Sequence, residues 1–245
     1  VAWPLHMELR NGDRNALSKP IALRGGATMA LEVVALRRDG FDGDIELAMD
    51  GLPPGVTAHG LKIPAGKSRG MMLVTARPDA ARGYANAAFV GRATVAGRPV
   101  TRPCRLATVA WPVPDSWGEI PSPRLLADVP VSVSGTDLAP LTITAKSPVV
   151  EATAGEKLTV PLVHRRTSEF TGDKIQMKAV GAGFETSPAF DLPVQADKSE
   201  VVLDLKALNV PPGEYRVSFL GGGVVKYRHQ PEVGAKGEAT AEKML

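Results

Sequence analysis

An internal repeat restricts this chain to two copies of one structural unit. The segment 31–47 reads LEVVALRRDGFDGDIEL, and the segment 158–177 reads LTVPLVHRRTSEFTGDKIQM. Both contain an alternating apolar stretch, an Arg-Arg pair, a Phe-x-Gly-Asp motif and a second alternating stretch. The match of Arg37 to Arg165 anchors the alignment of the two copies, which begin about half a chain length apart.

The spacing between the copies changes little along the chain. Phe41 matches Phe170, one position beyond the spacing set by the arginines, and Gly83 matches Gly213, one position further again. So small a change is typical of related copies whose loops differ slightly in length. The period is too long for a solenoid repeat and has the size of a whole domain. We therefore predict two tandem domains of the same fold, each with its phenylalanine buried.

Short alternating stretches predict that both copies are all-β. Met29, Leu31 and Val33 fall on one face of an extended strand, with Glu32 on the other face. Similar stretches follow at 44–49, 200–205, 215–219 and 224–227. The chain contains 25 Gly and 21 Pro, and their clusters separate these stretches as turn signals. Short strands with no amphipathic helix indicate a sandwich or a barrel.

Composition and the repeat together give the domain limits. We predict one domain at 1–110 and a second at 129–230. The segment 111–128, WPVPDSWGEIPSPRLLAD, is dense in proline and is predicted to be an extended linker. The residues 231–245 lack apolar periodicity and are predicted to form a loose tail. The chain begins without Met or a signal peptide, so we expect a longer parent protein.

The first copy carries a recognisable series of motifs: FDGDIEL at 41–47, GLPPGV at 51–56 and IPAG at 63–66. This series resembles the bacterial immunoglobulin-like domains of exported multidomain proteins of planctomycete type, similar to those appended to secreted glycosidases and proteases. The resemblance implies two tandem immunoglobulin-like antiparallel β-sandwiches and an exported location, in the periplasm, at the cell surface or outside the cell. It carries no catalytic or ligand-binding residues. The second copy keeps PPGEYRV at 211–217.

The sequence supports no enzyme, and we predict no catalytic residue, cofactor or metal ligand. The Gly-Lys-Ser at 66–68 has the wrong spacing for a phosphate-binding loop and no helix after it. The single Cys104 and the four scattered histidines do not form a metal-ligand pattern. The net charge of +3, without a basic stripe, gives no support for nucleic-acid binding.

Two groups of residues leave alternatives open. Asp39, Asp42 and Asp44 lie in one turn, where they either favour the turn itself or bind calcium through oxygen ligands. The solvated turn is the preferred interpretation. The tryptophans either pack between domains or present platforms for sugar rings, and packing is preferred. They are Trp3, Trp111 and Trp117.

The predicted function is that of a non-catalytic spacer or interaction module of a larger exported protein. Its expected partners are other domains of the parent chain or envelope proteins, and polysaccharide in the alternative of a carbohydrate-binding module of a secreted hydrolase. Open edge strands can recruit another strand. The candidate edge consists of Val224, Val225, Lys226, Tyr227 and Arg228. Its simpler interpretation is an ordinary last strand paired within its own sheet.

Overall fold

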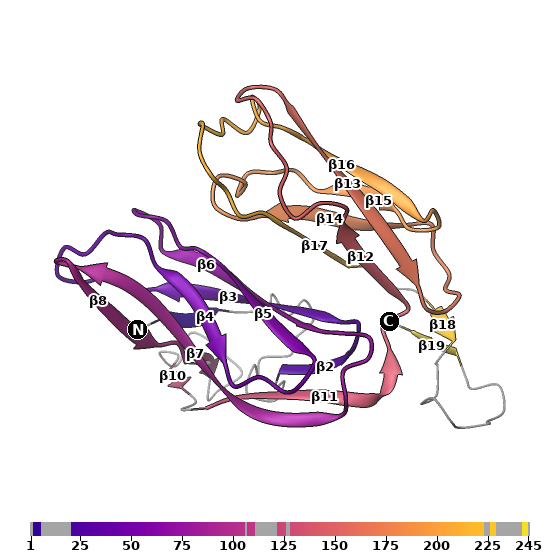
Figure 1. Cartoon of the computed structure of the whole chain (residues 1–245), viewed down its shortest axis with the longest axis horizontal. Coiled ribbons are helices and arrows are strands. Elements are labelled where there is room, and N and C mark those ends of the chain that lie inside the picture. The colour runs from indigo at the N-terminus through magenta and orange to yellow at the C-terminus, as the bar shows by residue number, and fades with distance from the viewer. Residues whose placement is uncertain are drawn as a thin grey trace, which may run out of the picture. The chain divides into compact units, whose positions relative to one another are not determined.

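The structure, a computed structural model, divides the chain into two compact units. It describes residues 2–5, 21–105, 107–110, 122–125, 128–222, 226–228 and 242–244. The first unit comprises Val1–Leu23 and Thr28–Ser134, and the second comprises Arg24–Ala27 and Gly135–Leu245. Strands account for the regular structure throughout these described residues, as Figure 1 shows. None of the described elements is a helix with the length and apolar character to cross a membrane.

The first unit is built from the strands β1 to β11. Their bounds are β1 Ala2–Leu5, β2 Ile21–Gly25, β3 Thr28–Ala35, β4 Glu46–Asp50, β5 Val56–Leu61, β6 Arg69–Ala76, β7 Gly83–Val95, β8 Arg98–Pro103, β9 Ala107–Ala110, β10 Ser122–Leu125 and β11 Val129–Leu138. One sheet has the order β1-β3-β6-β5, and the other has β4, β7, β11 and β2 with β8 also paired to β7. The pairings of β3 with β1 and β6, of β5 with β6, and of β7 with β4, β8 and β11 are antiparallel.

The strand order in the first unit is that of an immunoglobulin-like sandwich. The sheet β1-β3-β6-β5 has the order of strands A, B, E and D, and β4-β7-β8 has the order of C, F and G. The core lies between the two sheets, because buried Val33 and Val74 of one sheet cluster with Met49 and Phe89 of the other. The predicted all-β fold class is confirmed.

The second unit repeats this arrangement with fewer strands. Its bounds are β12 Leu141–Ala145, β13 Lys157–Arg166, β14 Lys174–Val180, β15 Phe190–Pro193, β16 Lys198–Asp204 and β17 Ser218–Gly222. One sheet has the order β12-β13-β16 and the other β15-β14-β17. Two further strands, β18 Lys226–Arg228 and β19 Glu242–Met244, pair with each other. The core again lies between the sheets, around the fully buried Phe184.

The backbone pairing confirms the repeat and fixes its register. In the first unit Leu47 pairs with Gly91 and Met49 with Phe89. In the second unit Met177 pairs with Gly221 and Ala179 with Phe219, which is the same ladder shifted along the chain. Because both members of each pair shift by the same number of positions, β14 and β17 are the counterparts of β4 and β7.

The register corrects one match of the sequence alignment. The backbone N–H of Ala35 donates to Ser68 O, and that of His164 donates to Asp197 O, so Ala35 at the end of β3 and His164 in β13 occupy equivalent positions. Counting two residues on from each, Arg37 corresponds to Arg166 rather than to Arg165. By sequence alone, Arg37 can be matched to either arginine of the adjacent pair. The two matches differ in structure, because a shift of one residue turns every side chain of the strand to the opposite face.

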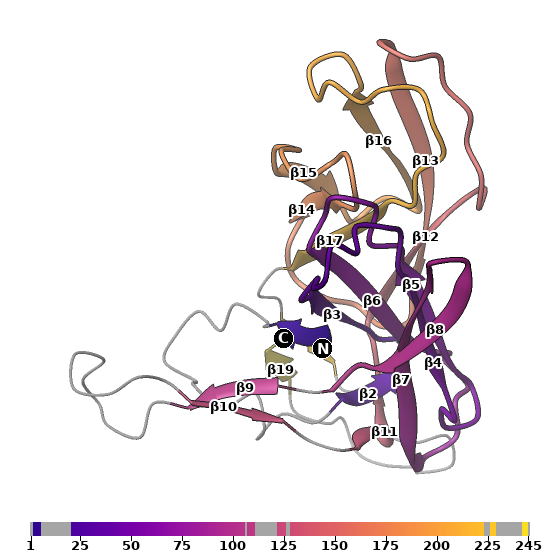
Figure 2. The same cartoon turned by 90° about the vertical axis from the view of Figure 1, so that its left-hand side faces the viewer.

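The strands β8 and β11 both pair with β7. β8 pairs with residues 90–95 of β7, and β11 pairs with residues 83–87 of the same strand. Together they form one edge, and the segment between Cys104 and Val129 leaves this edge and returns to it. This segment includes the ribbon of β9 and β10, which lie side by side (Figure 2). Of the segment 111–128, which was predicted to be a linker, the structure describes only Ser122–Leu125 and Asp128, so the linker stays a prediction.

Two local expectations were also wrong. Phe41 and Phe170 were expected to be buried, and both are partly exposed. The strand expected at 215–219 begins only at Ser218. Part of the expected loose tail forms β19, while the residues 229–241 lie outside the described part of the chain.

Candidate functional site

The motif residues of the first unit gather in the loop after β3, around the side chain of Arg37. Its guanidinium donates to the carbonyl oxygens of Lys67 at 2.8 Å, Gly43 at 2.6 Å and Pro64 at 2.8 Å. It also lies over the ring of Phe41, 5.4 Å from the ring centroid. The side chain is only 14% exposed. Arg37 thus joins the β3–β4 loop to the turn before β6.

The carboxylates of this loop bind the same turn. Asp42 Oδ1 accepts the backbone N–H of Gly66 at 2.9 Å, and Asp44 Oδ1 accepts that of Ala65 at 2.8 Å. Asp44 Oδ2 also accepts from Lys62 Nζ at 2.7 Å. The hydrogen bond from Lys62, followed by the one from Ala65, lowers the pKa of Asp44. The carboxylates of Asp42 and Asp44 therefore have hydrogen-bond partners in the segment between β5 and β6.

A metal site is not formed by these residues as the structure places them. Within the described ranges, no group of three or more His, Cys, Asp and Glu side chains lies close enough to hold an ion. Asp39 stands apart from the Asp42 and Asp44 contacts, at a turn position with a φ of 55°. The solvated turn remains our prediction for this segment.

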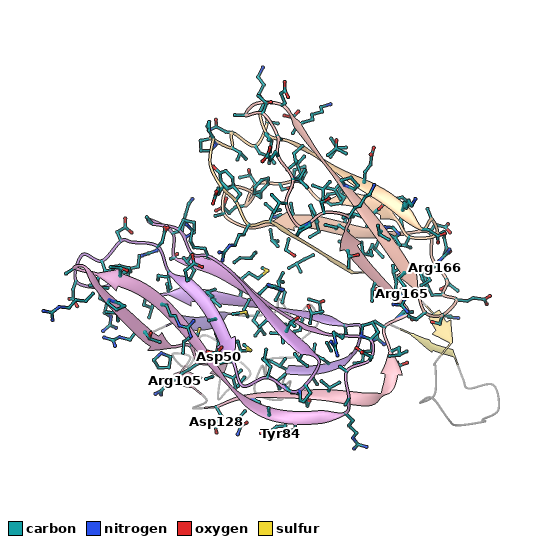
Figure 3. The ribbon with its side chains drawn as sticks, viewed as in Figure 1. Asp50, Tyr84, Arg105, Asp128, Arg165 and Arg166 are labelled. Atoms are coloured by element: carbon teal, nitrogen blue, oxygen red, sulfur yellow. The ribbon has the colours of Figure 1, made fainter. Side chains whose placement is uncertain are left out.

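The matching loop of the second unit is closed by different side chains. Arg166 donates to Asp197 Oδ1 at 2.9 Å and to Gln195 Oε1 at 3.3 Å. Gln195 Nε2 in turn donates to the carbonyl oxygen of Gly172 at 2.5 Å. Arg166 lies at the end of β13 beside Arg165, as Figure 3 shows. Both copies therefore use an arginine to link the loop to the turn; the carboxylates of the first link, Asp42 and Asp44, lie on the loop, and that of the second, Asp197, lies on the turn.

The histidines are not brought together. His164 is buried in the second core at 5% exposure, where its Nε2 lies 2.7 Å from Ser199 Oγ. Its Nδ1 has no hydrogen-bond partner among the described residues. His59 lies on β5 of the first unit and is exposed. His6 and His229 lie outside the described residues.

Aromatic side chains differ between the copies. Tyr215 donates from its hydroxyl to the carbonyl oxygen of Pro211 at 2.7 Å, which is the contact expected of a tyrosine corner. Tyr84, labelled in Figure 3, instead donates to Asn86 Oδ1 at 2.6 Å and is 65% exposed. The alternation of β7 puts Tyr84 and Asn86 on its outward face, opposite the buried Phe89. Sequence analysis did not select Tyr84 as a surface aromatic.

The structure does not describe a sugar-binding platform made by the tryptophans among its described residues. Trp3 lies in β1, where its backbone pairs with Val34. Trp111 and Trp117 lie outside the described residues. Their predicted packing role therefore stays a prediction.

The candidate interaction edge is partly paired. Lys226, Tyr227 and Arg228 form β18, which pairs with β19 of the same chain. The carbonyl oxygen of Lys226 also accepts the backbone N–H of Thr171 at 2.8 Å. Val224 and Val225 lie outside the described residues. Recruitment of a partner by this edge stays a prediction.

Comparison with known proteins gives distant similarities. No protein-family model and no curated protein matches the sequence. The chain is similar to domains 5-6 of the S-layer protein SbsC, with a TM-score of 0.27 and 11% identity over 92% of this chain and 91% of that one. It is also similar to the fibronectin(III)-like modules of CbhA from Clostridium thermocellum, with a TM-score of 0.23 and 12% identity over 92% of this chain and 86% of that one.

Proposed function

We propose that this chain is a non-catalytic module of a larger exported bacterial protein. It spaces or presents other domains and contacts envelope proteins or other domains of the same parent chain. The proposal includes an exported location and no catalytic residue, cofactor or nucleic-acid partner.

The hydrogen bonds made by the charged motif residues are the main support for this proposal. Arg37, Asp42 and Asp44 all bind backbone groups of the turn between β5 and β6, so the charges that the fold brings together link two connections of the sandwich. Catalytic acids and bases usually combine a perturbed pKa with access to a bound substrate. Asp44 has a lowered pKa, and its hydrogen bonds to Lys62 and Ala65 account for the shift.

Assays with the intact chain test the non-catalytic assignment. Chromogenic glycosides, esters and peptides should show no turnover above the buffer rate. Sedimentation with washed cell-envelope material should retain the folded chain, and the heat-unfolded chain serves as the control. Turnover that disappears on substitution of one titratable side chain would overturn the assignment.

One observation favours carbohydrate binding as a second candidate function. Tyr84 presents an exposed ring on an outward sheet face, and its bond to Asn86 restrains the hydroxyl. An aromatic ring held in this way offers an apolar surface to a sugar ring, and the neighbouring amide offers hydrogen bonds. We expect retardation in gels containing soluble polysaccharide to disappear in Tyr84→Ala and persist in Tyr84→Phe. Equal mobility of all three proteins in every polysaccharide would exclude this function for Tyr84.

A further inference from the structure

The two copies differ in the last strand of one sheet. In the first unit β6 lies between β3 and β5, in a sheet of the order β1-β3-β6-β5. Its counterpart in the second unit is β16, because the pair of Val33 with Gly70 and the pair of Leu162 with Ser199 belong to one ladder shifted along the chain. β16 ends a sheet of the order β12-β13-β16 and pairs with β13 alone among the described strands (Figure 2).

Matching pairs locate the counterpart of β5 in the second unit. Ile63, which follows β5, forms a bridge with Ile45. In the second unit Leu192 pairs with Ile175. Because β4 and β14 are counterparts, Ile45 matches Ile175, and Ile63 therefore matches Leu192. Counting back from these two residues places the six residues of β5 at 185–190 of the second unit.

The segment 185–190 does not form a strand beside β16. Pro188 occupies the position of His59, and proline has no N–H to donate to a neighbouring strand. The backbone N–H of Ser187 donates instead to Phe184 O, within a turn. The chain then joins the other sheet, where β15 pairs with β14. The far side of β16 is therefore left without a strand among the residues that the structure describes.

The backbone of β16 presents hydrogen-bonding groups at this edge. The N–H of His164 donates to Asp197 O, so the polar groups of Asp197, and of every second residue after it, face β13. The N–H and C=O groups of Glu200 and Val202 consequently point away from β13. No hydrogen bond joins these groups to another residue that the structure describes. An unpaired row of this kind is a template for strand addition.

The outward side chains of β16 carry charges in a self-complementary order. They alternate with buried side chains, all of them are exposed, and they are Lys198, Glu200, Val202 and Asp204. A positive charge thus lies at one end of the strand and a negative charge at the other. Neither Lys198 nor Asp204 forms an ion pair with a described residue. Asp204 uses Oδ1 to accept the backbone N–H of Ala207 at 2.8 Å, and its Oδ2 remains for a partner.

This order of charges selects one register for a pair of β16 strands. Two copies related by a two-fold axis pair antiparallel, and their edge-facing residues must lie opposite one another. An axis at Glu200 places the two glutamates opposite each other, and an axis at Val202 places Glu200 opposite Asp204. An axis at Val201 places Lys198 of each copy opposite Asp204 of the other. Opposite charges at facing positions stabilise a sheet and like charges destabilise it, so the third register is favoured.

We propose that β16 is a self-association edge, which pairs antiparallel with β16 of a second copy of this chain around a two-fold axis at Val201. The inference rests on the proposed function as an interaction module and names a partner of that module. The sheets of the two copies join into one sheet of the order β12-β13-β16-β16-β13-β12. An ion pair of Lys198 with Asp204 closes each end, and Val202, 50% exposed in one copy, is covered by the second.

Sedimentation equilibrium of the intact chain tests the register. The parent chain should form dimers as its concentration increases into the millimolar range. Lys198→Glu and Asp204→Lys should each weaken the dimer at least ~5-fold, because each places like charges opposite one another at both ends. An equal mixture of the two variants should recover the dimer of the parent chain, because the mixed dimer has opposite charges at both ends. Thermal unfolding at low concentration establishes that each variant is folded.

Proline at the edge tests the site without changing its charge. Val202→Pro removes an N–H that faces the edge, so it should abolish the dimer and change the stability of the second unit little. The matched control is Leu73→Pro at the counterpart position of β6. The backbone groups of Leu73 face His59 of β5, so this control should destabilise the first unit more. In the parent chain, the amides of Glu200 and Val202 should exchange ~10-fold more slowly in the dimer than in the monomer.

Four results would overturn the proposal. A parent chain that stays monomeric throughout would exclude self-association, and a dimer that survives Val202→Pro unchanged would place the interface elsewhere. A monomeric mixture of the two folded charge variants would exclude the register. Equal losses of stability in Val202→Pro and Leu73→Pro would show that the edge is already covered.

Hydrogen exchange of the parent chain gives the result if Asp204→Lys does not fold. Exchange at Glu200 and Val202 that does not slow on dimer formation would then overturn the proposal. All of these measurements use the purified chain alone. Their failure would therefore leave the non-catalytic assignment and envelope binding to their own assays, and the two failures are distinguishable.

Discussion

Arg37 and Arg166 occupy the same position in the two copies, and each carries its guanidinium to the turn before the next strand of its sheet. Arg37 binds three backbone carbonyls, whereas Arg166 binds the side chains of Asp197 and Gln195. The first link is the more buried, with Arg37 at 14% side-chain exposure against 36% for Arg166. Loss of the Arg37 contacts should therefore lower the free energy of unfolding more than loss of the Arg166 contacts.

Replacing Arg37 should destabilise the first unit. Arg37→Ala removes three charge-assisted hydrogen bonds, to the carbonyls of Gly43, Pro64 and Lys67, and we expect a loss of about 2–4 kcal/mol in the free energy of unfolding. Urea denaturation followed by hydrogen exchange within 28–76 measures it. The exposed neighbour Arg38 supplies the control, since Arg38→Ala should change stability by less than about 0.5 kcal/mol. Equal effects of the two variants would refute a structural role for Arg37.

The strands and the repeat were predictable because alternation and turn residues are local signals. The register of the repeat was less predictable. Arg165 and Arg166 match Arg37 equally well in sequence, and only the pairing of His164 with Asp197 distinguishes them. The start of β17 was misplaced because a strand exists only where another strand pairs with it. Proline density predicts an extended linker at 111–128, and most of that segment lies outside the described residues.

The site was less predictable than the fold. Asp42 and Asp44 are acidic turn residues in sequence, and their partners Gly66 and Ala65 lie on a turn well beyond the next two strands. Nothing in a single sequence announces such contacts.

Calcium should leave the first unit unchanged. Asp42 and Asp44 already accept hydrogen bonds from Gly66, Ala65 and Lys62, so an ion would have to break these bonds to bind. A ligand that binds the native state raises its melting temperature. We expect equal melting temperatures with excess calcium and with a chelator. A rise with calcium that Asp42→Asn removes would establish the calcium alternative.

Alkaline pH should destabilise the first unit through Cys104. Burial raises the pKa of its thiol from 9.0 to about 12, because the charged thiolate is not solvated in the core. The unfolded thiol ionises first, so stability is constant below pH 9 and falls between pH 9 and pH 12. The loss should be roughly 1 kcal/mol at pH 10.

The variant Cys104→Ala isolates this contribution. Alanine lowers stability at neutral pH because it removes the buried sulfur. The difference in unfolding free energy between the parent chain and the variant should shrink as pH rises from 9 to 11. A difference that stays constant over that range would show that the thiol is not protected in the native state.

The buried imidazole of His164 should lower the free energy of unfolding of the second unit. Its Nδ1 is buried without a partner among the described residues, and such a group costs about 1–3 kcal/mol. The double variant His164→Leu with Ser199→Ala removes this atom and leaves no unpaired hydroxyl. We expect its free energy of unfolding to rise by about 1 kcal/mol. The single variant His164→Leu is the comparison, and a double variant less stable than the parent chain would contradict the expectation.

The two tyrosines should respond differently to loss of their hydroxyls. Tyr215→Phe removes the bond to Pro211 O, which joins the turn 211–213 to the start of β17, and should cost about 1 kcal/mol. Tyr84→Phe removes a bond to a neighbouring exposed side chain and should cost less than about 0.5 kcal/mol. Thermal unfolding of both variants in one buffer measures the difference. A larger cost for Tyr84→Phe would contradict the assignment of the corner to the second copy.

The excursion between Cys104 and Val129 gives the first unit a site where sequence can be inserted at little cost. The chain leaves one edge of a sheet at β8 and rejoins the same edge at β11, so both ends of the excursion are fixed by pairing to β7. Closing a flexible loop of twice the length costs only about 0.6 kcal/mol more. A peptide tag or a whole guest domain placed between β9 and β10 would therefore leave the sandwich, and the strand that continues into the second unit, in register.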